Sequence, residues 1–142
     1  MNSAYDWYKK NIGVHRWIEQ IANNYPNNTA IVYDEQTLDY QTLNKKANQL
    51  SHLLKTKGVK PGSLVGIYLE QSPDMVIALL ATLKAGAAYI PIDHLYPKDR
   101  VEYMLENAKA DLLITTNSLS ESLNFDMPEI YIEEDTNNYP VN

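Results

Sequence analysis

The chain has 142 residues, of which 44% are apolar, enough to build the packed core of one domain. Twelve Lys and Arg stand against eighteen Asp and Glu, and this net charge of -6 argues against nucleic-acid and membrane partners because it offers no basic field for phosphate or anionic lipid. The absence of cysteine excludes disulfide frameworks, thiolate zinc sites and cysteine nucleophiles, and it is compatible with a reducing compartment.

The first predicted element is a helix over Val14–Asn24. Its apolar residues recur at helical spacing on one face: Val14, Trp17, Ile18, Ile21 and Ala22. The segment Tyr25–Asn28 ends this helix, so residues 1–28 are assigned as an N-terminal helix region. The opening stretch, Met1–Lys10, has no apolar core of the kind that secretory signals carry, and a cytoplasmic location is therefore expected.

A small hairpin and a second helix follow. Residues 29–33 and 36–38 are rich in strand formers and flank a turn at Asp34–Glu35, which predicts two antiparallel strands. Asp39 is placed to cap the next helix, which we expect over residues 40–57. The apolar face of this helix consists of Leu43, Ala47, Leu50 and Leu54.

The middle of the chain changes from strand to helix. Leu64–Leu69 is predicted to be a strand, and Ser72–Asp74 supplies an N-cap and a first-turn proline for a helix over residues 73–85. This helix is apolar nearly all round, which indicates burial on more than one side. The apolar stretch Met75–Ile92 does not predict a membrane span, because a lysine, a glycine and a proline interrupt it.

The same alternation continues and predicts the fold class. Ala88–Ile92 is expected to be a second buried strand, Pro97 opens a helix, and Asp111–Thr115 is the next strand. A last strand is expected at Ile130–Ile132. Strands that alternate with helices predict an α/β fold, with a mostly parallel sheet and helices on both faces.

No internal repeat or long linker divides the chain into two domains. We expect an α/β core over residues 29–115, with Leu64–Leu69 and Ala88–Ile92 among its most buried segments. The helices over residues 40–57 and 73–85 are expected to pack on the sheet. Residues 116–142 form a polar C-terminal stretch.

Three segments resemble one enzyme family. Leu83–Asp93 reads LKAGAAYIPID and resembles the motif L-K-A-G-x-A-Y-x-P-x-D of amino-acid adenylation domains. Tyr96–Leu105 resembles its continuation Y-P-x-x-R-x-x-Y-M-L, and Leu38–Leu43 resembles the first family motif L-T-Y-x-E-L more loosely. The resemblance covers roughly residues 30–115 and implies a partial N-terminal lobe of an adenylate-forming enzyme of nonribosomal peptide synthesis.

Two positions depart from the family pattern. Thr42 stands where a glutamate would complete a capping box with Asp39, and His94 stands where a proline is common. Losing the capping box weakens a helix start by about 1 kcal/mol at most, so this departure does not threaten the assignment.

The resemblance implies ATP, Mg²⁺ and an amino acid as ligands of the complete domain, and transfer of the aminoacyl group to phosphopantetheine on a carrier protein. The family's glycine-rich phosphate loop and catalytic lysine belong to sequence that would follow Asn142, and the five glycines here are too scattered to form such a loop. We therefore assign no catalytic, cofactor-binding or metal residue to this chain and expect it to be inactive alone. Its partners would be the remainder of the adenylation domain and a carrier domain.

Two alternatives to this interpretation stay open. A D-alanine–carrier-protein ligase has similar motifs, so the chain could be a fragment of one. A non-enzymatic role, as a truncated or split-protein interaction module, is the competing class.

Several polar residues are candidates for binding, and each has a structural alternative. Asp99 and Arg100 could grip a phosphate, but this pair is more typical of a solvated helix surface. The acidic run Glu133–Asp135 suggests a magnesium site, although a solvated loop is favoured because such sites normally need a phosphate ligand as well. Three widely separated histidines favour surface or packing roles over metal ligation: His15, His52 and His94.

Overall fold

The computed structural model describes residues 13–142, so the stretch Met1–Lys10 and its predicted lack of a secretory signal lie outside the described residues. The helices are α2 (Val14–Asn24), α3 (Tyr40–Thr56), α4 (Pro73–Lys84), α5 (Lys98–Ala108) and α6 (Asn117–Glu121). The strands are β1 (Thr29–Tyr33), β2 (Gln36–Asp39), β3 (Leu64–Leu69), β4 (Ala88–Asp93), β5 (Leu112–Thr115) and β6 (Glu129–Tyr131).

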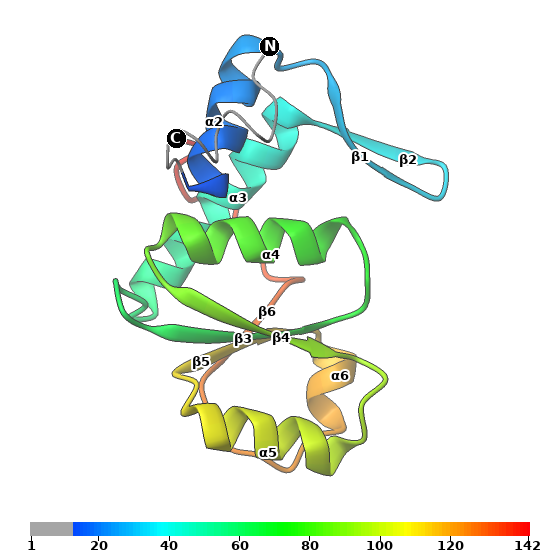
Figure 1. The fold of residues 1–142 in the computed structure, drawn as a ribbon, viewed down its shortest axis with the longest axis vertical. Helices are drawn as coiled ribbons and strands as arrows, with labels where there is room; N and C mark the ends of the chain where they lie inside the picture. The colour runs from blue at the N-terminus through cyan, green and yellow to red at the C-terminus, as the bar shows by residue number, and fades with distance from the viewer. Residues whose placement is uncertain (1–12) are drawn as a thin grey trace.

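A four-stranded parallel sheet in the order β4-β3-β5-β6 organises the molecule. Helix α4 covers one face of this sheet, and α5 and α6 cover the other (Figure 1). The predicted fold class, a parallel α/β sheet with helices on both faces, is thereby confirmed. The antiparallel hairpin β1–β2 is also confirmed, and it projects from the body as a separate two-stranded sheet.

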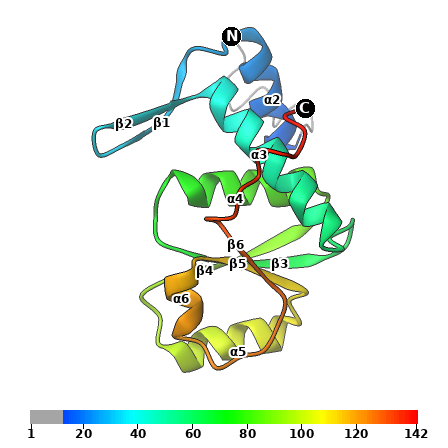
Figure 2. The ribbon, with the colours of Figure 1, turned by 180° about the vertical axis from the view of Figure 1, so that it is seen from behind.

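Helix α3 packs mainly on α4, outside the helix layer that touches the sheet (Figure 2). Asp39 caps it as predicted, since the Asp39 carboxylate accepts the Thr42 N–H at 2.8 Å and this bond lowers the pKa of Asp39. The helices over residues 40–57 and 73–85 were both predicted to pack on the sheet. This holds for α4, whereas α3 packs on α4 instead. The reason is the composition of α4, which is apolar on both sides and requires a cover on its outer face.

The start of α4 differs from the prediction in one detail. Ser72 occupies the N-cap position and Pro73 the first turn, but the Ser72 side chain caps nothing. Its hydroxyl donates instead to the Glu70 carbonyl at 3.2 Å. None of the described helices has the length and apolar content needed to cross a membrane.

Strand β4 is the main correction to the predicted burial. It lies at one end of the sheet, and Ile92 is its one buried residue, at 1% exposure. The prediction that Ala88–Ile92 is among the most buried segments is therefore wrong. Strand β3, by contrast, is buried from Val65 to Leu69, because it has a neighbouring strand on each side and helices on both faces.

The C-terminal stretch contributes to the sheet. Strand β6 confirms the last predicted strand with a shift of one residue, and Ile130 at its centre is fully buried. Helix α6 was not predicted because its sequence is polar and short. Thr116 caps its N-terminus, because the Thr116 side chain accepts the Leu119 N–H at 3.1 Å.

Gly66 allows α5 to approach β3 closely, and this generates a first prediction. A Cβ added at Gly66 would lie 2.6 Å from Cδ2 of Leu105 and 3.1 Å from Cδ1 of Leu113, and both leucines are buried. Gly66→Ala should therefore lower the free energy of unfolding by about 1–3 kcal/mol, measured by urea denaturation. Leu105→Ala makes room, so the double variant should cost less than the two single costs added together; strict additivity would contradict the contact.

Candidate functional site

The longest motif, Leu83–Asp93, forms a corner made of the end of α4, a turn and strand β4. Gly86 adopts a φ of +81°, a left-handed conformation that suits glycine, and it packs close to Pro61. Ala88 then enters the sheet by donating its N–H to the Ser63 carbonyl at 2.9 Å. This stretch therefore connects helix to strand. The carboxylate of Asp93 at its end accepts the Leu95 N–H at 2.9 Å.

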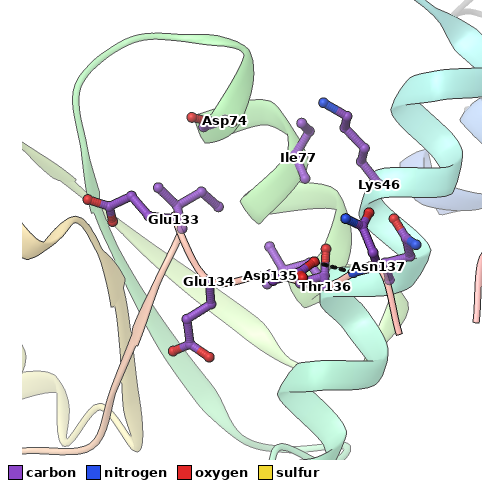
Figure 3. A pocket seen from close by; sticks show the side chains of 11 residues that line it. Lys46, Asp74, Ile77, Glu133, Glu134, Asp135, Thr136 and Asn137 are labelled. Carbon is purple, nitrogen blue, oxygen red and sulfur yellow. Dashed lines mark hydrogen bonds between the residues drawn. The ribbon is translucent and has the colours of Figure 1, made fainter. Parts of the chain in front are cut away.

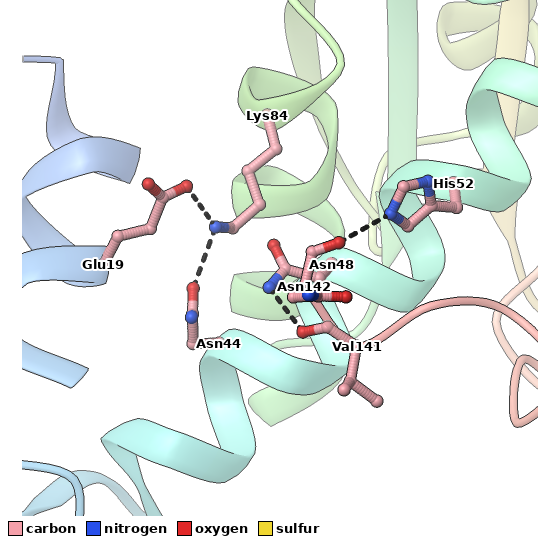
Figure 4. A network of polar contacts seen from close by, with 7 residues as sticks. All are labelled: Glu19, Asn44, Asn48, His52, Lys84, Val141 and Asn142. Carbon is pink, nitrogen blue, oxygen red and sulfur yellow. Dashed lines mark hydrogen bonds and ion pairs between the residues drawn. The ribbon is translucent and has the colours of Figure 1, made fainter. Parts of the chain in front are cut away.

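Lys84 of the motif has a role that the sequence analysis missed. Its ammonium donates to the Glu19 carboxylate of α2 and, at 2.8 Å, to the Asn44 side-chain oxygen of α3 (Figure 4). The Lys84 side chain is 5% exposed, whereas that of Glu19 is 41% exposed. One buried cation thus joins three helices. A lysine near the end of an otherwise apolar helix was the available signal.

The carboxyl ends of the strands enclose a crevice of about 460 Å³. The chain leaves β3 toward α4 on one face of the sheet and leaves the adjacent β5 toward α6 on the other, so the crevice lies at a topological switch point, where α/β folds commonly bind ligands. It is lined by Tyr33, Leu69, Glu70, Ser72, Asp74, Thr116, Ser118, Leu119, Ile132 and Glu133.

The lining of this crevice does not suit a phosphate group. Glu70, Asp74 and Glu133 contribute three carboxylates, and no lysine or arginine is among the described lining residues. A triphosphate placed there would meet like charges without a compensating cation. The crevice is suited instead to hydroxyl groups or cations.

The acidic run Glu133–Asp135 borders a neighbouring cavity of about 400 Å³ (Figure 3). The three carboxylates point in different directions, and each accepts a backbone N–H: Glu133 from Asn117, Glu134 from Tyr131, and Asp135 from Asn137. In residues 13–142, no group of three or more acidic or histidine side chains is placed to hold a metal ion. Each carboxylate of the run thus helps to hold the backbone around it.

Arg100 stacks on an aromatic ring. Its guanidinium carbon lies 4.1 Å from the centroid of Tyr96, and Asp99 beside it is exposed in the first turn of α5. A cation–π contact at the surface accounts for the arginine without a phosphate.

The three histidines lie in separate places. His52 contacts the Asn142 carbonyl at 3.0 Å, and His94 lies 3.5 Å from Asp93. Burial lowers the pKa of His15 below the ordinary 6.5; Glu19 raises it, while Lys84 and Arg16 lower it further. The structure brings no two of the three histidines together.

The family of AMP-binding enzymes matches residues 18–138 of this chain. Bacitracin synthase 1 of Bacillus licheniformis is 43% identical over 128 residues, which are 90% of this chain and 2% of the relative. Tyrocidine synthase 1 of Brevibacillus parabrevis is 44% identical over 114 residues, which are 80% of this chain and 10% of the relative. The chain thus spans a small part of the curated relatives it matches.

Solved structures with the same fold are also synthetases. The nonribosomal peptide synthetase FmoA3, in a form with bound alpha-methyl-L-serine-AMP, has a TM-score of 0.82 at 30% identity, covering 89% of this chain and 14% of that chain. The N-terminal subdomain of Klebsiella oxytoca NpsA has a TM-score of 0.81 at 23% identity, covering 91% of this chain and 33% of that chain. The second likeness shows the fold alone.

The unequal exposure of the Lys84–Glu19 pair gives a prediction about stability. Glu19→Ala leaves a buried ammonium without its carboxylate and should cost about 1–3 kcal/mol of unfolding free energy. Lys84→Met leaves a carboxylate that water can solvate, so it should cost less. Chemical denaturation measures both, with the exposed Glu35→Ala as the control for loss of one negative charge. A larger cost for Lys84→Met would contradict the assignment.

The lowered pKa of His15 predicts a pH dependence. The unfolded chain binds a proton at His15 near pH 6.5, whereas the folded chain does so at lower pH, so folding loses stability as the pH falls below 6.5. The loss stops increasing once the pH is below the folded pKa. His15→Gln should remove this component, measured as the difference between the two stability profiles from pH 8 to about pH 5. Identical profiles for both proteins would contradict it.

Proposed function

Since the chain belongs to the family of AMP-binding enzymes, we propose that it serves as the N-terminal segment of an amino-acid-activating domain of a nonribosomal peptide synthetase. The complete domain would form an aminoacyl adenylate from ATP and an amino acid and pass it to a phosphopantetheine thiol. The observation that carries the proposal is the motif Leu83–Asp93, which joins α4 to β4 inside a fold shared with FmoA3.

The residues of this chain do not fit the triphosphate or its magnesium ion. Phosphate loops bring several backbone N–H groups to one point, and this requires glycines close together. Here Gly58, Gly62 and Gly86 lie in separate turns, and Gly66 lies inside β3. The Glu133–Asp135 carboxylates accept backbone N–H groups and diverge. We therefore derive no chemical step in this chain and place the reaction in the remainder of the domain.

The chain contributes architecture to that reaction. Its sheet and the Lys84 network form an α/β layer against which the remainder would pack. A carrier domain is the second proposed partner, as the resemblance to adenylation domains implies; an artificially fused adenylation–PCP di-domain of Klebsiella oxytoca shares this fold. We also propose a cytoplasmic location, which the absence of cysteine favours.

The proposal predicts activity only in combination. Purified residues 1–142 should give no detectable amino-acid-dependent exchange of pyrophosphate into ATP. Exchange should become detectable when the part of the tyrocidine synthase 1 adenylation domain that follows the matched region is added, with the intact synthase as the positive control. Melting temperature, recorded in the same samples, reports association.

Three outcomes would count against this assignment. Exchange by residues 1–142 alone would place catalytic groups in this chain. A sharp melt unaffected by the added part, together with no exchange, would favour the non-enzymatic alternative. A rise in melting temperature without exchange would keep the architectural role and contradict the catalytic one.

A further inference from the structure

Strand β4 has one side open. Within residues 13–142, it pairs with β3 and with no other strand. In a parallel ladder, the N–H and C=O groups of one residue point to the same side, and the side alternates along the strand. The bond from the Ala88 N–H to Ser63 fixes the direction, so Ala88, Ile90 and Ile92 face β3. The backbone groups of Tyr89, Pro91 and Asp93 consequently face the open side.

The sheet therefore loses no hydrogen bond at Pro91, because a donor at this position would point away from β3. At the centre of the open side Pro91 presents a carbonyl and a ring and offers no donor. The Asp93 carbonyl is already used, because it accepts the Tyr96 N–H at 3.1 Å. The open side is left with two separated N–H groups, those of Tyr89 and Asp93, on either side of a proline.

An apolar cavity of about 460 Å³ lies beside the end of this strand. Leu95 at its rim is 78% exposed, and Tyr89 on the strand is 37% exposed. The cavity is lined by Leu69, Gln71, Met75, Pro91, Ile92, Asp93, His94, Leu95 and Tyr96. Unpaired strand groups next to exposed apolar side chains are the features of a surface that another polypeptide covers.

We propose that the open side of β4 receives polypeptide from the remainder of the adenylation domain, and that Pro91 denies it to a second copy of this chain. The inference rests on the proposed function. A second copy adding its own β4 would need a continuous row of donors and acceptors, which the proline interrupts. A segment that forms hydrogen bonds at Tyr89 and Asp93 and inserts an apolar side chain beside Leu95 meets no such obstacle. The same fold occurs in synthetase chains far longer than this one, so such polypeptide is available.

Amide hydrogen exchange resolved by residue tests the docking half. In isolated residues 1–142, the Tyr89 and Asp93 amides should exchange at least about tenfold faster than those of Ala88, Ile90 and Ile92, because a free amide exchanges from the native state. Adding the remainder of the tyrocidine synthase 1 adenylation domain should protect Tyr89 and Asp93. Pyrophosphate exchange, measured in parallel, reports the proposed function separately.

The two readouts distinguish the two proposals. Exchange activity without protection at Tyr89 and Asp93 would overturn the docking surface and leave the function standing. Protection without activity would support the docking surface and contradict the function. The absence of both pyrophosphate exchange and amide protection would overturn both proposals.

Sedimentation velocity of proline variants tests the second half. Pro91→Val supplies a donor on the open side and should increase self-association at least about tenfold relative to the natural chain, whereas Pro97→Val, at an exposed helix start outside β4, should not. Adding Tyr89→Pro to Pro91→Val removes another outward donor and should reverse the increase. Circular dichroism establishes that each variant is folded. A folded Pro91→Val chain that associates no more than the natural one would overturn the protective role of Pro91.

Discussion

Burial of strand β3 on both faces and along both edges determines where most other elements lie. Its residues from Val65 to Leu69 are nearly inaccessible, so they need α4 above, α5 below and a strand on each side. Gly66 shows how tight this packing is, because no room remains for a side chain against Leu105. Once α4 is placed between the sheet and α3, it is enclosed from two directions. This enclosed position explains why α4 is apolar on most sides and why its lysine, Lys84, is buried.

Residues of the family motif Leu83–Asp93 each meet a requirement of the fold. Lys84 ends an enclosed helix with a charge that reaches α2 and α3. Gly86 supplies the left-handed turn that brings the chain back toward the sheet. Pro91 lies on the side of β4 where no donor is used. None of these roles touches a reacting atom, and the acidic crevice at the strand ends would repel a triphosphate. The contacts of these motif residues with the rest of the fold are therefore sufficient to explain their residue types.

Local sequence patterns predicted the helices and strands well. They did not predict features that depend on contacts between residues far apart in the sequence. Helical spacing in Val14–Asn24 and the capping position of Asp39 depend on neighbouring residues, so the sequence contains them. The exposure of β4 was missed because an apolar strand at the end of a sheet and one at its centre have similar sequences; strand order decides between them. The same limit hid the Lys84 network, whose partners lie 65 and 40 residues away. The short polar helix α6 lacked a periodic signal.

The meaning of the proline in this motif depends on its position in the ladder. At residue 90 a proline would remove an N–H that points at β3 and break the internal sheet, whereas at residue 91 it removes one that points away. Pro91 therefore removes no hydrogen bond from the sheet. It changes only which polypeptides can pair with the open side of β4. An edge strand that is short, half-exposed and next to apolar side chains is a liability for a soluble chain, and a proline at its centre limits the liability. Because the outward groups on either side remain usable, protection against self-pairing and access for a specific partner are compatible on one strand.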